Sequence, residues 1–480
     1  MATNTLKEML TELKTICSRC ILCYTTANPC YKTFAEQADI NEKHCSSCLG
    51  ILEQNQILNV VDKVAKKLNK ENYTTDSFAL ALAFPQCLVL RKRALLAHIK
   101  ESNFFNTELH TTKCNDLMNP KEAYKLSIIK TLEQVTKKKY NIKSPLLVKV
   151  QFTYFKEDEE IKRLEPLLPK PSQKRRFQKK HNTNQKSPLN NIQLITETVN
   201  KLPDSKVVQY TSVPPERAEK PCDINISFVH EPIYIAGRYN KYSRELSQTP
   251  WLIDGERKTE SSVQELICDR LIKATGASEV KFMSSGREDC DVRMLGKGRP
   301  FVAGLVNPKT TNLPADEVRS LEREINQSTE LVGVRDLQVT DKESLVILKA
   351  GENEKKKCYS AKIWCPEPID DEQLDGINTT KDLKIGQKTP LRVLHRRPLC
   401  VRERTIYSMN IQRINKEEDT THHYQLQLKT EAGTYIKEFV HGDLGRTIPS
   451  MCTLMGAPFD ILELDVDEVQ LDWPPKIEST

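Results

Sequence analysis

A short polar stretch in the second half of the chain reads FMSSGREDCDVR over residues 282–293. It places two arginines and three acidic residues around a serine and glycine turn within twelve positions. An aspartate held between arginines stays ionised and can act as a nucleophile or a base. A polar surface turn would carry the same residues, and the spacing alone does not decide between these two interpretations.

Two further stretches place polar residues in apolar surroundings. Residues 357–361, KCYSA, enter an apolar strand, where Tyr359 could stack on a base or simply pack in a core. Residues 432–438, AGTYIKE, follow a predicted strand and are expected to hold Lys437 on a strand. If this lysine points inward it needs an anionic partner, and an aspartate of residues 282–293 would serve.

Two basic loops flank these stretches. Residues 249–262, TPWLIDGERKTESS, combine an aromatic residue, a glycine turn and two cations ahead of a helix. Residues 384–404 hold seven lysines and arginines against one acid. This local excess suits phosphate contacts, although a solvated surface loop would also tolerate it. The exposed aromatic residue and one cluster favour RNA: Arg392, His395, Arg396 and Arg397.

The chain has 480 residues, a length that allows about three domains with separate cores. Its net charge is +7. Its most apolar run, residues 78–90, is broken by Pro85 and is shorter than the roughly 20 residues of a membrane helix. The first ten residues do not resemble a signal peptide. We therefore expect no membrane partner and a location in the nucleus and cytoplasm. There the fifteen cysteines are expected to be metal ligands, core residues or reactive thiols rather than disulfides.

Six of the cysteines lie within residues 1–50 and indicate a metal site. Two C-x2-C pairs separated by 24 residues can bring four thiolates onto one zinc ion, and no ligand position then remains for water, so the zinc would be structural. The pairs are Cys17 with Cys20 and Cys45 with Cys48. The alternative is a scatter of free cysteines. Three other residues compete as ligands: Cys23, Cys30 and His44.

The pattern along the chain predicts an α+β protein with a helix-rich first half. Residues 51–142 are largely helical, and residues 147–154 alternate as a strand does. Residues 170–191 are basic and almost without apolar side chains, which predicts a flexible segment. The Pro-rich residues 203–221 resemble a linker. We therefore expect a zinc module at 1–50, an accessory domain at 51–215 and a catalytic domain at 222–480.

The second half is predicted to be rich in strands. Ser262 and Glu265 form the signature of a capping box that opens a helix, and residues 315–326 predict a second helix. Four apolar runs predict strands: 345–348, 359–364, 424–428 and 461–466.

Four segments together carry a resemblance to a known family: AGRYNKYSRELSQTPWLIDGERKTESSVQEL, SSGREDCDVRMLGKGRPF, DLKIGQKTPLRVLHRRPL and GTYIKEFVHGDLGRT. They closely resemble the archaeal and eukaryotic tRNA pseudouridine synthase family numbered ten, which modifies uridines 54 and 55 of the T arm. The resemblance covers roughly residues 225–475 and extends more weakly through the paired C-x2-C and the CLGIL of residues 48–52. It implies a mixed-sheet catalytic domain behind an accessory domain that contains a THUMP fold.

The resemblance also implies roles for individual residues. Asp289, in the G-R-E-D element that begins Gly286-Arg287, corresponds to the nucleophile, with Asp291 as the neighbour that could be mistaken for it. Tyr359 lies against the target ring, and Lys437 pairs with the catalytic aspartate. The pocket is completed by two apolar residues, Ile436 and Leu464.

The two basic loops receive roles in the same way. Residues 249–262 resemble a forefinger loop that grips RNA, with Trp251, Arg257 and Lys258, and residues 384–399 resemble a thumb loop. The thumb contributes Lys388, Arg392, His395, Arg396 and Arg397, and Arg287 also contacts substrate. The zinc ligands implied are Cys17, Cys20, Cys45 and Cys48, which decides against the competing residues.

The implied reaction isomerises a flipped uridine through covalent attack by the aspartate, at C6 of the base or C1′ of the ribose. It needs no organic cofactor, and the partner would be tRNA, bound by a monomer. Two other functions are weighed: an RNA-binding protein without activity, and a zinc-dependent adaptor that uses the first half of the chain.

Overall fold

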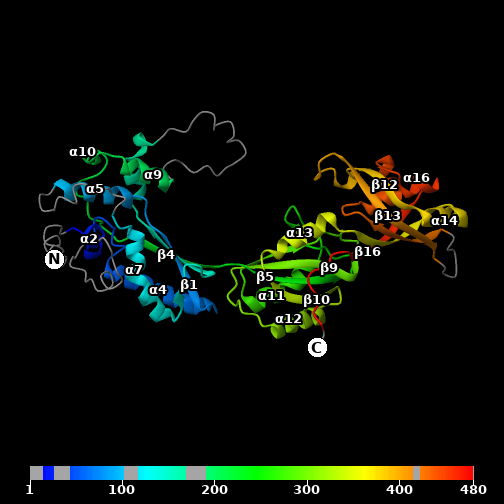
Figure 1. Cartoon of the computed structure of the whole chain (residues 1–480), viewed down its shortest axis with the longest axis horizontal. Coiled ribbons are helices and arrows are strands. Elements are labelled where there is room, and N and C mark those ends of the chain that lie inside the picture. The colour runs from blue at the N-terminus through cyan, green and yellow to red at the C-terminus, as the bar shows by residue number, and fades with distance from the viewer. Residues whose placement is uncertain (1–14, 26–43, 102–116, 169–190, 415–421, 479–480) are drawn as a thin grey trace. The chain divides into compact units, whose positions relative to one another are not determined.

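The structure of the chain is a computed structural model that describes residues 15–25, 44–101, 117–168, 191–414 and 422–478. The chain divides into two compact units, residues 1–230 and 231–480, and each is described by itself. Figure 1 labels many of the elements of each unit. The predicted flexible basic segment, residues 170–191, lies outside the described residues except for Asn191.

The first unit is built on a four-stranded mixed sheet. Its order is β2 (Lys139–Tyr140), β1 (Ser77–Ala83), β3 (Leu146–Thr153) and β4 (Asp223–His230). β1 runs parallel to both neighbours, and β3 runs antiparallel to β4. The predicted alternation is confirmed, because Val148, Val150 and Phe152 are buried while the residues between them are exposed.

Helices pack on this sheet and share one apolar core with it. The amphipathic pattern that predicts helix 60–68 is confirmed in α4 (Gln54–Glu71), whose apolar face is buried. The remaining helical elements are α2 (Ser18–Thr25), α5 (Leu88–Glu101), α7 (Pro120–Thr136), α8 (Glu157–Lys162), η1 (Glu165–Leu167), α9 (Ile192–Asn200) and α10 (Asp204–Val207). No helix among the described residues is long and apolar enough to cross a membrane.

The segment predicted as a linker, residues 203–221, is instead held against the first unit. Val207 is buried beside Ala94, and the buried Arg91 donates a 2.7 Å hydrogen bond to the carbonyl of Glu216. The segment leads directly into β4, which completes the sheet of the first unit. The units therefore divide after His230 rather than at the predicted residue 222, because β4 finds its hydrogen-bonding partner in β3.

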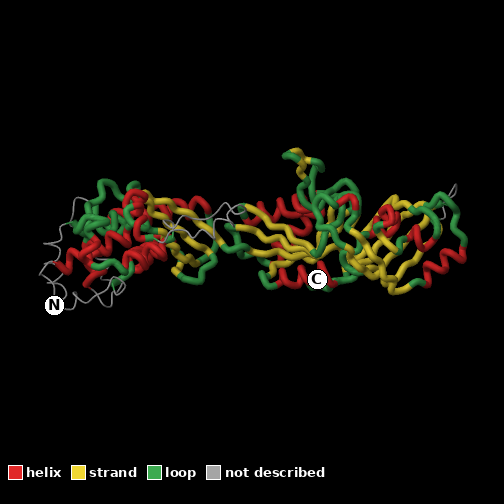
Figure 2. Tube along the Cα trace, turned by 90° about the horizontal axis from the view of Figure 1, so that it is seen from above, coloured by secondary structure: helices red, strands yellow, loops and turns green. Residues whose placement is uncertain are grey.

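The second unit contains one ten-stranded mixed sheet, drawn in yellow in Figure 2. Its order is β10-β5-β9-β16-β11-β14-β13-β12-β15, and β8 pairs with β9 outside this path. The bounds are β5 (Ile233–Lys241), β8 (Glu279–Ser284), β9 (Arg293–Val306), β10 (Val332–Thr340), β11 (Lys357–Trp364), β12 (Lys381–Lys388), β13 (Val401–Arg413), β14 (His423–Thr430), β15 (Thr447–Ile448) and β16 (Asp460–Val469).

Short helices and one hairpin complete the second unit. They are α11 (Val263–Thr275), α12 (Ala315–Ser328), α13 (Ser344–Glu354), α14 (Asp371–Thr379), η5 (Leu391–Val393), α15 (Ile436–His441), η6 (Gly442–Gly445) and α16 (Met451–Met455), with the hairpin β6 (Leu252–Ile253) and β7 (Glu256–Arg257). The cap at Ser262 is confirmed, since its Oγ accepts the amide of Glu265 and α11 follows. The mixed α/β architecture agrees with the predicted α+β class.

Two local predictions are wrong. Residues 345–348 lie in helix α13, not in a strand, and only Leu348 of this apolar run is buried. A run of four apolar residues cannot by itself distinguish a short strand from a helix. Lys437 lies in the first turn of helix α15, not on a strand, because Gly433 at φ +77° turns the chain after β14.

Candidate active site and cysteine cluster

The acidic turn, residues 285–292, joins β8 to β9 and presents both candidate aspartates. Gly286 has φ +94°, and a Cβ there would lie 2.9 Å from Arg299 Nη1 and 3.0 Å from Lys357 Nζ. Only glycine fits this position without displacing its neighbours. The turn therefore has one defined path, and Asp289 and Asp291 have defined positions on it.

A buried network fixes the base of the acidic turn. Glu288 accepts hydrogen bonds from Arg299 Nε at 2.8 Å and from the Tyr239 hydroxyl at 2.9 Å. Gln248 donates to the Tyr239 hydroxyl and to the carbonyl of Gly286, at 2.7 and 3.1 Å. Burial raises the pKa of Tyr239 well above its usual range, and the adjacent Glu288 carboxylate raises it further. The Glu288 carboxylate therefore holds the base of the acidic turn in place and is not available to the substrate.

Lys241 supports the same turn from below. Its buried ammonium donates three hydrogen bonds to backbone carbonyls, those of Leu246, Asp289 and Cys290, at 2.8, 3.2 and 2.6 Å. Burial lowers the pKa of this lysine. All three N–H groups of Lys241 bond to the backbone, so this lysine holds the turn in place. It forms no hydrogen bond with the side-chain carboxylates of Asp289 and Asp291.

The two aspartates bind different cations. Asp291 Oδ2 accepts a 2.6 Å hydrogen bond from Lys437 Nζ, whereas Asp289 Oδ2 lies 3.9 Å from the same ammonium. Asp289 Oδ2 accepts instead from Arg392 Nη1 at 2.9 Å. The resemblance implies that Lys437 pairs with Asp289; the structure places it near both aspartates and hydrogen-bonded to Asp291. Partial burial would raise the pKa of Asp291, but the lysine outweighs this and lowers it.

Arg392 has a second partner behind the site. Its Nε donates a 2.7 Å hydrogen bond to Glu438 Oε1, and the Glu438 side chain is only 2% exposed. Burial would lower the pKa of Arg392, but its bond to Glu438 and the charge of Asp289 raise it. One guanidinium thus connects the thumb segment, helix α15 and the acidic turn.

The apolar residues implied by the resemblance lie on adjoining elements. Ile436 begins α15 and Leu464 lies on β16, and both are buried. Tyr359, on the neighbouring β11, is half-buried, and burial raises its pKa to about 12. Arg244 joins this wall to the acidic turn, because its Nη1 donates to the carbonyls of Leu464 and Asp291, at 2.8 and 3.0 Å.

The predicted forefinger loop contains the β6–β7 hairpin, with Asp254 and Gly255 at positive φ in its turn. Its aromatic residue is well exposed, since 42% of the surface of Trp251 remains accessible. The two cations are less free than their positions suggest: Arg257 pairs with Glu265, and Lys258 lies 3.1 Å from Glu256. Arg287 is exposed on the acidic turn.

The predicted thumb loop leaves the end of β12 at Lys388 and returns into β13. Thr389 closes its base: its Oγ1 donates to the carbonyl of Pro398 at 2.7 Å, and its own carbonyl accepts from Arg446 Nη2 at 2.6 Å. Four other residues of the loop are exposed: Lys388, His395, Arg396 and Arg397. The lysine and the two arginines present positive charge to solvent. Arg392 is 40% exposed as well, but its guanidinium binds the two carboxylates.

Several residues that build this site are not predicted from the sequence, namely Lys241, Arg244, Gln248, Glu288, Arg299 and Glu438. Each lies inside one of the segments that carry the family resemblance, and two lie in the quoted motifs, Glu288 in G-R-E-D and Glu438 at the end of AGTYIKE, but no role is predicted for any of them. Their common signal is a charged or amide side chain beside apolar strand residues, as in the IAGRYNK sequence of β5. Such residues need buried partners, and the partners lie far away in sequence.

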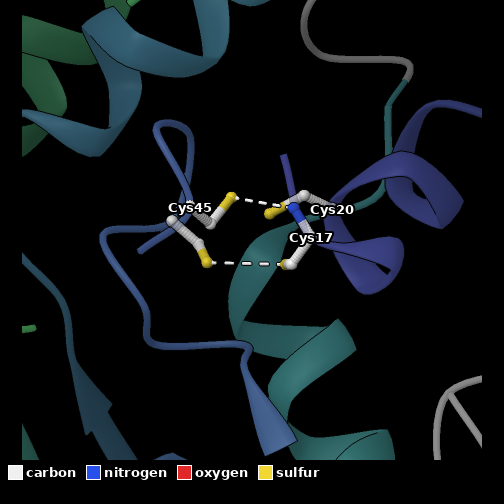
Figure 3. Close-up of side chains that lie close together, drawn as sticks. Cys17, Cys20 and Cys45 are labelled. Atoms are coloured by element: carbon white, nitrogen blue, oxygen red, sulfur yellow. Dashed lines mark hydrogen bonds between the residues drawn. The ribbon is translucent and has the colours of Figure 1, made fainter. Parts of the chain in front are cut away.

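The four predicted metal ligands form a buried cluster in the first unit. The thiols of Cys17, Cys20, Cys45 and Cys48 lie within 4.8 Å of one another. Figure 3 shows Cys17, Cys20 and Cys45 converging from two segments of the chain. The Sγ atoms of Cys17 and Cys48 are 3.8 Å apart, which equals the edge of a tetrahedron with zinc–sulfur bonds of about 2.3 Å. The cluster can hold one metal ion.

The two competing ligands that the structure describes, Cys23 and His44, are directed elsewhere. Cys23 donates to the carbonyl of Arg19 at 3.3 Å, and His44 Nδ1 lies 3.0 Å from Glu53 Oε2. Cys30 lies outside the described residues. Glu53 also accepts the amide of Cys45 at 2.6 Å, so His44 and Glu53 brace the second cysteine pair rather than join it.

Comparison with known proteins assigns the chain to a family. The model for the Pus10 C-terminal region matches residues 234–470, and the model for the eukaryotic Pus10 N-terminal region matches residues 45–226. A Xenopus laevis relative, tRNA pseudouridine synthase Pus10, is 41% identical over 91% of this chain and 82% of its own length. The chain belongs to the Pus10 family.

Other Pus10 proteins are also similar. The human tRNA pseudouridine synthase Pus10 is 40% identical over 91% of this chain and 80% of its own length. The archaeal Pus10 of Thermofilum pendens is 38% identical over 50% of this chain and 53% of its own length. Among solved structures, a Cbf5-Nop10-Gar1 complex shows 16% identity over 48% of this chain and 47% of that one, with a TM-score of 0.26.

Proposed function

We propose that this chain isomerises uridine to pseudouridine in the T arm of tRNA, at position 54, 55 or both, with Asp289 as the nucleophile. Membership of a family of tRNA pseudouridine synthases supports the reaction. The observation that supports the residue is its setting: the Asp289 side chain is 41% exposed and lies between two cations, on a turn held from below by buried groups. An accessible carboxylate held in one position is what a covalent nucleophile requires.

The chemistry needs only a rearrangement of the nucleotide. A stacked uridine must first be flipped into the site, which costs a few kcal/mol. The Asp289 carboxylate then attacks C6 of the base or C1′ of the ribose, and the N1–C1′ bond breaks. The uracil turns and rejoins through a C5–C1′ bond, and the bond between Asp289 and the substrate carbon breaks, which returns the free carboxylate. The proton lost from C5 is balanced by one gained at N1. Tyr359, Ile436 and Leu464 would confine the ring during this rotation.

The exposed cations and the exposed tryptophan would supply the free energy for flipping. Lys388, Arg396 and Arg397 present positive charge on one segment, where phosphates could replace counterions, and the exposed His395 lies beside them. Trp251 offers an apolar face on which an unstacked base could lie. Arg287, Arg257 and Lys258 would add contacts around the same nucleotide, the last two only by exchanging their acidic partners for phosphate.

The first unit would serve as an RNA-binding accessory region that contains a THUMP fold. Its cysteine cluster would hold one structural zinc ion, because four buried thiols provide a complete tetrahedral set with no place for a substrate oxygen. We expect the protein to act as a monomer, in the nucleus and the cytoplasm, without an organic cofactor.

The direct test is to map pseudouridine in a tRNA transcript after incubation with the purified full-length protein. Transcripts that carry cytidine at position 54, at position 55 or at both distinguish the two targets. We expect product at one or both T-arm positions and none in the doubly substituted transcript. A protein that binds tRNA tightly but forms no pseudouridine would contradict the proposal and support the RNA-binding alternative.

A further inference from the structure

We propose that Arg392 is a positioning residue for the nucleophile, anchored on the buried carboxylate of Glu438, rather than a contact to RNA phosphate. The inference rests on the proposed function, because it concerns the role of Asp289. Arg392 lies in the predicted thumb segment among residues that face solvent. Its side chain is 40% exposed, yet its guanidinium forms hydrogen bonds with two carboxylates, those of Asp289 and Glu438.

Glu438 explains why Arg392 stays in this position. Its side chain is 2% exposed, and Arg392 Nε lies 2.7 Å from its Oε1. Its Oε2 is buried without a hydrogen-bond partner among the described residues. If Arg392 left to meet a phosphate, the Glu438 carboxylate would lose its cation inside the protein, which is costly. Substrate phosphate would therefore have to compete with an ion pair whose acidic partner is buried.

The backbone around Arg392 is also fixed. The amide of Leu391 donates to Asp443 Oδ2 at 3.2 Å, and Val393 is buried. The two residues that flank Arg392 therefore hold the short helix η5 against the rest of the second unit. Arg396 and Arg397 are exposed, and so in part is Arg392, but of the three only Arg392 forms ion pairs with carboxylates among the described residues. The predicted thumb loop is thus held in place around Leu391 and Val393, whereas Arg396 and Arg397 face solvent.

The geometry requires an arginine. Nε and Nη1 of one guanidinium reach Glu438 and Asp289 at the same time. The single ammonium of a lysine is a compact point charge without this fixed fork, so it would satisfy one carboxylate at the expense of the other. The charge of a lysine would nevertheless serve a phosphate contact, and this difference separates the two roles.

The two carboxylate oxygens of Asp289 therefore have different roles. Arg392 holds Asp289 Oδ2, and the other oxygen accepts no hydrogen bond from the described residues. Oδ1 is thus the oxygen available to the substrate carbon, and the bond to Arg392 limits rotation of the carboxylate. Lys437 fulfils the corresponding task for Asp291.

The experiment measures tRNA affinity and single-turnover pseudouridine formation at saturating full-length enzyme, for Arg392→Lys, Arg392→Gln, Glu438→Gln and the double variant Arg392→Gln/Glu438→Gln. Two comparisons are included. Arg396→Gln removes a solvent-facing cation of the same segment, and Arg413→Gln removes a remote arginine that pairs with the exposed Asp371. Thermal unfolding checks that each variant is folded. The double variant is essential, because Arg392→Gln alone leaves Glu438 as a buried unpaired charge.

We expect Arg392→Lys and the double variant each to slow the single-turnover step roughly 10- to 100-fold, with nearly unchanged affinity and unchanged salt dependence of binding. The two charge removals should not be additive, since both break the same connection. Arg396→Gln should lower affinity, and Arg413→Gln should change neither quantity. A full-rate Arg392→Lys, or an Arg392→Gln whose whole loss is in affinity and salt slope, would overturn the inference. Absence of product from the unmodified protein would instead reject the proposed function.

Discussion

Lys437 donates its 2.6 Å hydrogen bond to Asp291, although the two residues are 146 positions apart in the chain. The candidate nucleophile, Asp289, is therefore hydrogen-bonded to a different cation, Arg392. Two carboxylates on one turn, each with its own counter-cation, can both remain charged at close quarters. This arrangement assigns different tasks to residues that look interchangeable in the sequence, and it makes their replacement informative.

Asp289→Asn should reduce pseudouridine formation below detection while leaving tRNA binding nearly intact. The amide keeps the shape of the side chain but removes the nucleophilic carboxylate. Asp291→Asn should retain measurable activity, because Asp291 serves to hold Lys437. Both variants are compared in product mapping and in a binding assay with the same tRNA. The reverse result, an active Asp289→Asn with an inactive Asp291→Asn, would move the nucleophile by two residues.

Lys437→Met should slow the chemical step roughly 10- to 100-fold. In the same variant the Asp291 carboxyl should take up its proton at a higher pH, because Lys437 lowers the pKa of Asp291 in the folded protein. The measurements are the single-turnover rate at neutral pH and an NMR titration of the Asp291 carboxyl. An unchanged rate would remove Lys437 from this role.

Replacing Arg396 and Arg397 by glutamate should weaken tRNA binding and flatten its dependence on salt. The slope of log K against log salt falls by roughly 0.7 to 0.9 for every phosphate that the protein no longer neutralises. Titrations at several salt concentrations measure this directly. A double replacement of Arg319 and Arg323 by glutamate, on helix α12, changes the net charge by the same amount and is the control. If the slope does not change, these two arginines lie away from the RNA.

Asp465→Asn should destabilise the second unit by about 1 to 3 kcal/mol at neutral pH. Asp465 accepts bonds from Arg293 Nε and Nη2, at 2.9 and 2.7 Å. Burial would raise its pKa, but the arginines outweigh this and lower it. A lowered pKa contributes stability that is full above the unfolded value of about 3.9 and is lost as pH falls through the folded value.

The difference in stability between the parent protein and Asp465→Asn should therefore shrink below about pH 4. Denaturant titrations at neutral and acid pH measure it. Asp371→Asn is the matched comparison, because its pair with Arg413 is largely exposed and should contribute little at any pH. A difference that persists unchanged in acid would mean that Asp465 stabilises the unit through shape rather than charge.

Cys17→Ser or Cys48→Ser should lose one equivalent of zinc, measured by elemental analysis of the purified protein. Apparent binding free energies of such sites are about 10 kcal/mol or more, so the segment around the cluster should become sensitive to protease. The variants should still convert T-arm uridine at saturating tRNA, because the proposed chemistry lies in the second unit. Folded protein without zinc would contradict the metal site. Complete loss of turnover with a folded second unit would contradict the separation of metal from chemistry.

The sequence predicts well the features that depend on neighbouring residues. The alternation in β3, the amphipathic α4 and the serine cap of α11 are all confirmed, because each rests on local spacing. The doubled C-x2-C is confirmed as one buried cluster, since its spacing reflects the geometry of the site.

The features that depend on distant residues cannot be predicted in this way. The basic surroundings of Arg392 in the sequence suggest an RNA contact, yet its partners are a turn 103 positions earlier and a helix 46 positions later. No role is predicted for Glu438, because the neighbouring residues in the sequence do not indicate that its carboxylate is buried. The predictions for residues 345–348 and 203–221 are wrong for a related reason: packing against other elements decides their conformation.

The pairing of β4 with β3 also tells where the chain can be cut. A fragment that starts at residue 222 would carry β4 without the strand that covers its edge, and would expose Ile226 and Phe228. A fragment that stops at residue 215 would leave β3 with an open edge, and such edges invite aggregation. Only two residues, 231 and 232, connect β4 to β5. Separate expression of the halves should therefore divide the gene between the codons for His230 and Glu231.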